Sequence, residues 1–188
     1  MLFFKNEIIM LRLILFLLLF LQISIAFANP KLDKARKLYL GAVKDEDKLD
    51  ESILLFEELK KEIPNIQGKA TTYLGSLTML KGKHAFWPHK KVEYVNEGIK
   101  IMDQGLRQDP NNLESLFIYG SSCFYLPFFL GKSDLADQKF KKFIEIINED
   151  EMKKYEPDIM KNALKFLLEK IELTEEEKTK LNNLLTTL

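Results

Sequence analysis

The chain of 188 residues has little cysteine, tryptophan and histidine, and no excess of charge of either sign. One cysteine cannot close an internal disulfide, so a disulfide-stapled scaffold is excluded. Eight glycines and six prolines are too few for a collagen-like or low-complexity chain. Basic and acidic residues number 28 each, and this balance argues against a protein that coats nucleic acid. A folded chain of this length can bury a sizeable core.

Motifs of catalysis are also scarce. Neither a Gly-x-Ser-x-Gly elbow nor a His-Glu-x-x-His pair occurs in the sequence. Gly131-Lys132-Ser133 resembles the end of a phosphate-binding loop, but the first glycine of that motif would fall at Leu126. We therefore expect a protein that is not an enzyme and that needs no cofactor.

The N-terminal segment has the layout of an export signal. Lys5 and Arg12 precede an apolar run over residues 13–21, and Ala26-Phe27-Ala28 offers the small side chains that a signal peptidase accepts. We expect cleavage after residue 28, with an uncleaved anchor, or a start at Met10, as alternatives. Residues 13–28 are 16 in number and are short for a bilayer span, so the protein is expected to be exported, periplasmic or extracellular, without a membrane span.

Beyond residue 28 the apolar residues recur at helical spacing, and the turn-forming residues lie between these segments. Pro88 is expected to open one helix, and Thr174 with Glu177 to cap another. Asn111 with Glu114 is expected to form a further capping box, and Cys123 to be a small buried residue. The predicted fold class is all-α, built from antiparallel helix hairpins, with helices at about residues 30–42, 47–63, 70–82, 88–106, 111–124, 133–147, 157–167 and 174–188.

One spacing pattern occurs three times in this helical region. Small and large residues follow at spacings of 4, 3 and 5 in Ser52-Phe56-Leu59-Pro64, Gly98-Met102-Gly105-Pro110 and Ala136-Phe140-Phe143-Asn148. The preceding helices carry Leu40-Gly41, Leu74-Gly75 and Tyr119-Gly120, and Gly41 and Gly75 are 34 residues apart. A small residue lets two helices approach, and a large one fills the space beside it. These residues resemble the signature of tetratricopeptide (TPR) repeats.

The resemblance implies a single domain over residues 29–188, similar to small exported TPR-like bacterial proteins of unassigned activity. Three repeats would occupy about residues 32–64, 67–110 and 113–148, and residues 156–188 would form a C-terminal capping hairpin. Such a stack forms a short superhelix with a concave binding face. The residues that the resemblance places on that face are Thr72, Ser76, Ser121, Ser122 and Tyr125.

Residues 81–91 interrupt the repeat and contain both histidines and the only tryptophan. We expect Phe86 and Trp87 to fill the gap between the adjoining helices, because aromatic side chains usually serve packing. Alternatively, lysines and Trp87 near the helix start at Pro88 bind a small anionic ligand. The candidate residues are Lys83, His84, Trp87, His89, Lys90, Lys91 and Tyr94. A weaker alternative is a metal site on His84 and His89.

A second insertion, residues 125–132, is nearly all apolar. We expect it to fold back over the adjoining helices, since large exposed apolar patches are uncommon on soluble monomers. The alternative is that Phe128 and Phe129 face a partner or a lipid surface.

These observations favour an exported, non-catalytic binding or scaffold module that engages a protein, a peptide or a small ligand on its concave face. A solute-handling accessory of a periplasmic transport system is the first alternative, and it requires a pocket that encloses a metabolite. A metal-dependent enzyme using His84 and His89 is the second. A protein or peptide partner is expected, whereas nucleic acid is not.

Overall fold

Every regular element between residues 29 and 188 is helical, so the predicted all-α class is confirmed for this region. The computed structural model describes residues 29–188, and the predicted signal peptide over residues 1–28 lies outside this range. The elements are α2 (Pro30–Ala42), α3 (Glu46–Glu62), η1 (Pro64–Ile66), α4 (Gln67–His84), α5 (Pro88–Gln108), α6 (Leu113–Phe124), η2 (Phe128–Leu130), α7 (Ser133–Ile146), α8 (Glu149–Met152), α9 (Pro157–Lys170) and α10 (Glu175–Thr186).

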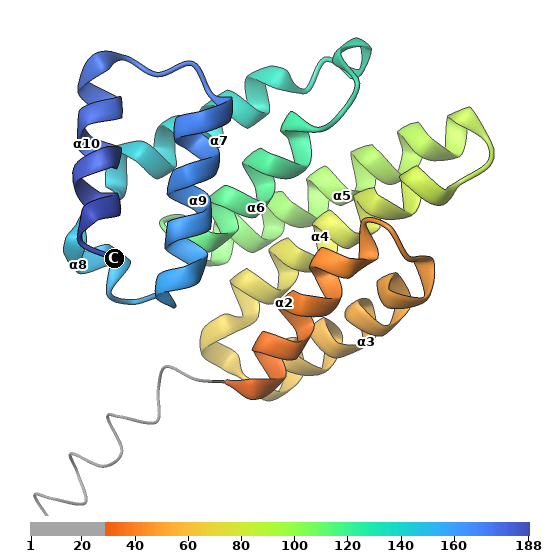
Figure 1. Cartoon of the computed structure of the whole chain (residues 1–188). Coiled ribbons are helices and arrows are strands. Elements are labelled where there is room, and N and C mark those ends of the chain that lie inside the picture. Colours follow the sequence, from red (N-terminus) through yellow and green to blue (C-terminus); the bar gives the residue numbers. More distant parts are fainter. Residues whose placement is uncertain (1–28) are drawn as a thin grey trace, which may run out of the picture. The chain divides into compact units, whose positions relative to one another are not determined.

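Consecutive long helices run in opposite directions, so that α2, α4 and α6 point roughly the same way (Figure 1). The α2–α3 turn, the α4–α5 turn and the α6–α7 loop consequently lie at the same end of the stack (Figure 1). Hydrogen bonds between side chains hold these three helices together near that end. The Tyr39 and Ser76 hydroxyl oxygens are 2.9 Å apart, and those of Ser76 and Ser122 are 2.7 Å apart.

Two capping boxes were predicted, and the structure has one of them. Thr174 and Glu177 form the predicted capping box at the start of α10. The prediction for α6 is wrong, because Asn112 rather than Asn111 caps this helix, accepting a hydrogen bond from the third helical residue. The Glu114 side chain does not reach back to the cap and instead forms ion pairs inside the fold.

The first three residues of each copy of the repeated pattern, called the aligned triplets below, lie on the buried faces of α3, α5 and α7. The triplets are Ser52-Phe56-Leu59, Gly98-Met102-Gly105 and Ala136-Phe140-Phe143. Gly75 of α4 and Gly98 of α5 show why small residues are required there. A Cβ added at Gly98 would lie 2.5 Å from the Gly75 carbonyl oxygen, which is far inside van der Waals contact. The two helix backbones therefore pack directly against each other at this point, and only glycine permits that approach.

The core of the described region consists of two hydrophobic clusters. The first is formed by α2, α3 and α4, with Ile118 of α6, around Phe56 and Tyr73, which stack at 4.4 Å. The second extends from Met79 of α4 to α10, around Phe140 and Phe143. Within residues 29–188, no helix combines the length and the apolar character of a bilayer-spanning segment.

Candidate functional site

Two of the predicted concave-face residues are used inside the fold. Thr72 is buried, and its hydroxyl donates a hydrogen bond to the Gly68 carbonyl oxygen at 3.0 Å. Ser76 is also buried and bonds to Tyr39 and Ser122. The Thr72 bond lies within α4, whereas the Ser76 bonds join α4 to α2 and α6. Because both hydroxyls are buried and already bonded within the fold, neither is available to a partner.

The remaining concave-face candidates are divided between packing and solvent. The Ser121 and Ser122 hydroxyls each donate to the Ile118 carbonyl oxygen, at 3.2 Å and 2.6 Å, and both residues are partly buried. Tyr125 is exposed at the end of α6. Of the five residues, Tyr125 is therefore the one that is mostly exposed, although its ring contacts those of Phe124 and Phe166.

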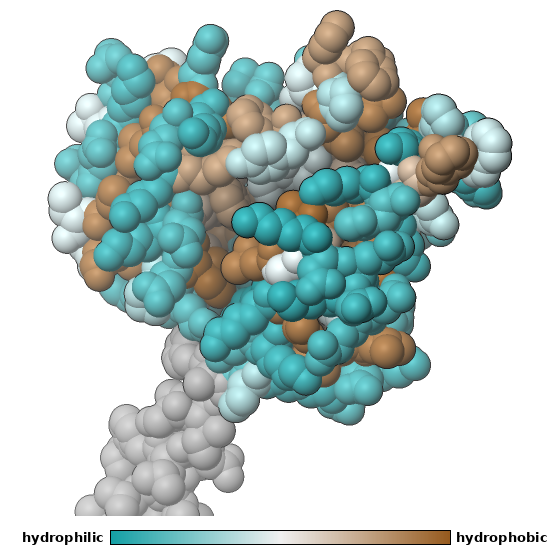
Figure 2. All heavy atoms as spheres, turned by 45° about the vertical axis from the view of Figure 1, so that its right-hand side comes forward, coloured by the Kyte–Doolittle hydropathy of each residue, from teal (hydrophilic) through white to brown (hydrophobic). Residues whose placement is uncertain are grey.

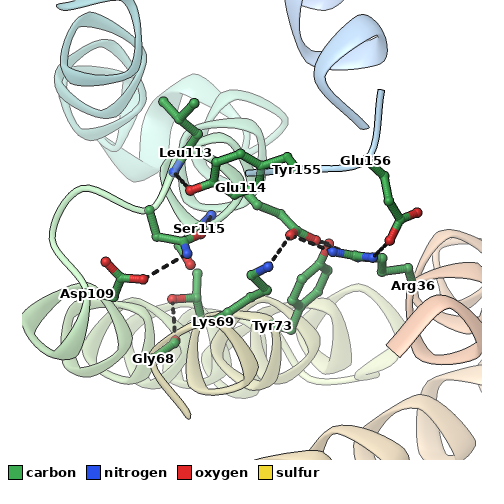
Figure 3. Close-up of polar contacts among 12 residues, drawn as sticks. Arg36, Gly68, Lys69, Tyr73, Asp109, Leu113, Glu114, Ser115, Tyr155 and Glu156 are labelled. Atoms are coloured by element: carbon green, nitrogen blue, oxygen red, sulfur yellow. Dashed lines mark hydrogen bonds and ion pairs between the residues drawn. The ribbon is translucent and has the colours of Figure 1, made fainter. Parts of the chain in front are cut away.

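A buried charge cluster, which the sequence did not indicate, lies around Glu114 (Figure 3). Glu114, in the first turn of α6, is only 1% exposed. Its two carboxylate oxygens accept hydrogen bonds from the Arg36 guanidinium, both at 2.7 Å. Lys69 lies 2.8 Å from one oxygen, and the Tyr73 hydroxyl donates to the other at 2.7 Å. Four donors thus saturate a single carboxylate.

The cluster connects the N-terminal helix to the segment before α9. Arg36 also pairs with Asp33 on its own helix and with Glu156, which precedes α9. Tyr155 accepts a hydrogen bond from the Leu113 backbone at 2.9 Å, and its ring lies beneath the Lys69 ammonium (Figure 3). These contacts join residues that are up to 120 positions apart in the chain.

The electrostatics of this cluster favour a structural role. Burial alone would raise the pKa of Glu114, but the charges and hydrogen bonds of Lys69 and Arg36 hold it at about 2. Burial, together with the adjacent carboxylate, raises the pKa of Tyr73. A general acid or base must exchange a proton near the working pH. Glu114 stays ionised and fully bonded, so it does not meet that requirement.

The α4–α5 turn presents its aromatic side chains to solvent. Phe86 is 84% exposed and Trp87 is 60% exposed, so the expectation that they fill the gap between the adjoining helices is wrong. Their rings contact each other edge to face at 5.1 Å, and Trp87 also stacks beside His89 at 6.3 Å. The turn extends beyond the core, so these rings meet only their neighbours in sequence.

Basic residues surround these two rings. His89, Lys90 and Lys91 are exposed on the first turn of α5, and Lys90 pairs with Glu93 at 2.8 Å. Lys83 donates to the Val43 carbonyl oxygen at 2.5 Å, which ties the α4–α5 turn to the α2–α3 turn. His84 and Tyr94 are partly buried, and His84 Nε2 is buried without a hydrogen-bond partner. The candidate residues therefore surround the turn and do not converge on one point.

The α6–α7 loop is a second exposed apolar projection. Phe128 is 91% exposed and Phe129 is 73% exposed, so the expectation that this segment folds back is wrong for these residues. Leu126 and Leu130 do pack partly against the core. They anchor the loop, while a left-handed turn at Gly131 (φ 61°) leads the chain into α7. The space-filling view shows apolar side chains standing out on this side of the molecule (Figure 2).

A hollow of about 380 Å³ lies elsewhere, between α7 and the α9–α10 connection. Lys141, Lys170 and Phe124 are among its lining residues, and none of the predicted site residues lines it. Within residues 29–188, no three His, Cys, Asp or Glu side chains are grouped so as to hold a metal ion. His84 and His89 therefore have no third protein ligand of these types beside them in that region.

Residues 29–188 thus display two exposed aromatic loops at one end of the helix stack, with a saturated charge cluster inside it. No protein-family model matches the chain, and searches of curated proteins and of solved structures gave no match either.

Proposed function

We propose that the protein is an exported, non-catalytic binding and scaffold module, built as a short TPR-like stack. The observation that carries this proposal is the exposure of Phe86, Trp87, Phe128 and Phe129 at one end of an otherwise well-packed stack. Exposed apolar side chains gathered on one side of a folded protein mark an interaction surface, whereas scattered single ones do not. We call the α4–α5 turn and the α6–α7 loop together the aromatic end.

The aromatic end replaces the concave face as the proposed contact surface, because Thr72 and Ser76 are buried and bonded within the fold. The repeat arrangement is supported by the three aligned triplets, whose members lie on buried helix faces. Export rests on the leader pattern of residues 1–28. The non-catalytic assignment is supported by Glu114, the most buried carboxylate described, whose proton affinity is too low for acid–base chemistry at neutral pH.

A photo-crosslinker tests this proposal without assuming the class of partner. Trp87 is replaced by benzoylphenylalanine in one variant. In the matched control the same replacement is made at Leu54 of α3, which is 66% exposed but does not belong to the aromatic end. Irradiation in the native compartment should yield an adduct, with protein or lipid, from position 87 and much less from position 54. Equal yields at both positions, or none at either, would contradict the proposal.

A solute-handling role is the second candidate, and the hollow beside α7 is the observation that favours it. Its volume of about 380 Å³ is in the range of small-molecule sites, and its lining combines Lys141 and Lys170 with Asp137, Glu172 and Glu177, which suits a solute that carries both charges. A thermal-shift screen with zwitterionic metabolites tests it. A ligand that raises the melting temperature of the wild type but not of Lys141→Ala supports this role. A screen in which no ligand raises the melting temperature contradicts it.

A further inference from the structure

We propose that the aromatic end docks on an anionic lipid bilayer, with the aromatic rings entering the headgroup region and the lysines held at its surface. This inference rests on the proposed function and names the class of partner. Four features of the described residues support it: the shape of the exposed surface, its residue types, its charge, and the attachment of the loops to the core.

The exposed aromatic side chains lie on separate projections and do not form a groove. Phe86 with Trp87 and Phe128 with Phe129 each form an edge-to-face pair, at 5.1 Å and 6.2 Å, and no ring contact joins one pair to the other. A protein partner would need a matching socket for each projection. A fluid headgroup layer accepts several separate tips at once, because lipids rearrange around each side chain.

The residue types suit the membrane interface. Tryptophan and tyrosine concentrate at the boundary between headgroups and hydrocarbon, where an apolar ring and a polar edge are both satisfied. Trp87 and the loop residue Tyr125 have this character and are exposed. Phenylalanine is typical of the inserted face of interfacial segments.

The charge of the aromatic end is complementary to anionic lipid. Residues 81–91 carry four lysines and no acidic residue, and residues 125–132 add Lys132 without an acid. Lysines beside a bilayer attract anionic headgroups at short range. The α2–α3 turn at the same end of the stack, with the first turn of α3, carries Asp45, Glu46 and Asp47, which offset part of this positive charge (Figure 1). The lysines of the aromatic end lie beside the exposed rings in sequence, so they are the charges that would face the headgroups when the rings enter.

Both loops are held in place by the body of the protein. The hydrogen bond from Lys83 to the Val43 carbonyl links the last turn of α4, just before the α4–α5 turn, to the α2–α3 turn. Leu126 and Leu130 anchor the α6–α7 loop. The Tyr39–Ser76–Ser122 hydroxyl series holds α2, α4 and α6 in register near that end. Little ordering of the loops is then required on binding, which favours affinity.

Vesicle sedimentation tests the proposal. Purified protein and its variants are prepared with identical processing, so that any contribution of residues 1–28 is the same in each. Vesicles of phosphatidylcholine with phosphatidylglycerol are compared with pure phosphatidylcholine. We expect binding to the anionic vesicles to fall about tenfold in Phe86→Ala/Trp87→Ala. Lys90→Gln/Lys91→Gln removes two positive charges and leaves Glu93 unpaired, so affinity for the anionic vesicles should fall about thirtyfold, at about 1 kcal/mol for each lysine.

The control is Leu54→Ala, which removes an exposed apolar side chain of α3 and should leave binding unchanged. Unchanged melting temperatures show that each variant is folded. Equal binding to anionic and neutral vesicles, or equal binding by Phe86→Ala/Trp87→Ala and Leu54→Ala, overturns the lipid proposal. A protein adduct from position 87 together with no vesicle binding overturns it too, but leaves the proposed function intact. Self-association that is lost in Phe86→Ala/Trp87→Ala would identify a second copy of the chain as the partner instead.

Discussion

Replacing Glu114 by glutamine should be the most destabilising single change among the ionised residues described. The side chain keeps its size but loses its charge, and this leaves the Arg36 and Lys69 charges without their buried counter-ion. Breaking a buried pair in this way costs about 3–5 kcal/mol. The pKa leads to a similar value: a change from 4.5 to about 2 corresponds to about 3 kcal/mol of stabilisation.

The pH dependence has a definite sign. Because folding lowers the pKa of Glu114, its contribution is complete above the unfolded value of 4.5 and is lost as pH falls towards 2. Urea unfolding followed by circular dichroism, at pH 7 and at pH 3, measures this contribution. The free energy of unfolding of the wild-type protein should exceed that of Glu114→Gln by about 3 kcal/mol at pH 7, and by clearly less at pH 3.

The matched control for this experiment is Glu51→Gln. Glu51 pairs with Lys34 at 2.9 Å, a distance similar to that in the buried cluster, but both side chains are more than half exposed. Exposed ion pairs contribute about 0–1 kcal/mol to stability, so the free energy of unfolding of Glu51→Gln should be close to that of the wild type. If Glu114→Gln costs no more than Glu51→Gln, or if its cost does not change with pH, the assignment of a buried and saturated carboxylate is refuted.

Three further predictions concern packing and exposure. Gly98→Ala should lower the free energy of unfolding by about 2 kcal/mol or more in urea titrations, because the new Cβ meets the Gly75 backbone. Its control is Gly41→Ala, which should be neutral or stabilising, because the new Cβ meets only the flexible Lys48 side chain. Burial raises the pKa of the Cys123 thiol to about 12, so this thiol should react with Ellman's reagent only after the protein unfolds. Rapid reaction of the native protein would contradict the burial of Cys123. Phe128→Ala should change the melting temperature by less than 2 °C or so, since this ring contacts little of the core, and a large decrease would show that it packs.

The helices could be predicted from the sequence because their signals are local. Apolar residues at helical spacing, prolines at helix starts and the Thr174–Glu177 box each act within one or two turns. The four-residue α8 was not predicted, since Glu149–Met152 is too short to show a period. Its Asn148 cap, which accepts two backbone hydrogen bonds, was the available indication.

The buried charge cluster could not be predicted in this way. Glu114 stands in the first turn of α6, where an acidic residue usually complements the helix dipole, and this ordinary role hides its burial. Its partner Arg36 is 78 positions away, and no spacing rule connects two residues across that distance. The only local indication was the composition of the turn, in which Leu113 and Leu116 flank the acid and are themselves buried.

The aromatic loops were misjudged for a related reason. Aromatic side chains usually serve packing, so packing was the expected role of Trp87. Large exposed apolar patches are uncommon on soluble monomers, so the segment with Phe128 was expected to fold back. Periodicity identifies the face of a helix that packs, but it contains no information on what a loop side chain meets. Only the fold shows that the tips of both loops extend past the end of the stack (Figure 1), and that Trp87 and Phe128 are exposed there.

The most direct test of the central claim uses the fluorescence of Trp87, since it is the only tryptophan of the chain and lies at the aromatic end. Emission is recorded while vesicles of anionic lipid, with bromine atoms on the acyl chains, are added. Docking through the aromatic end predicts a blue shift of the emission and its quenching by the brominated lipid, both suppressed by high salt. An emission spectrum that stays unshifted and unquenched at saturating anionic lipid would contradict the account.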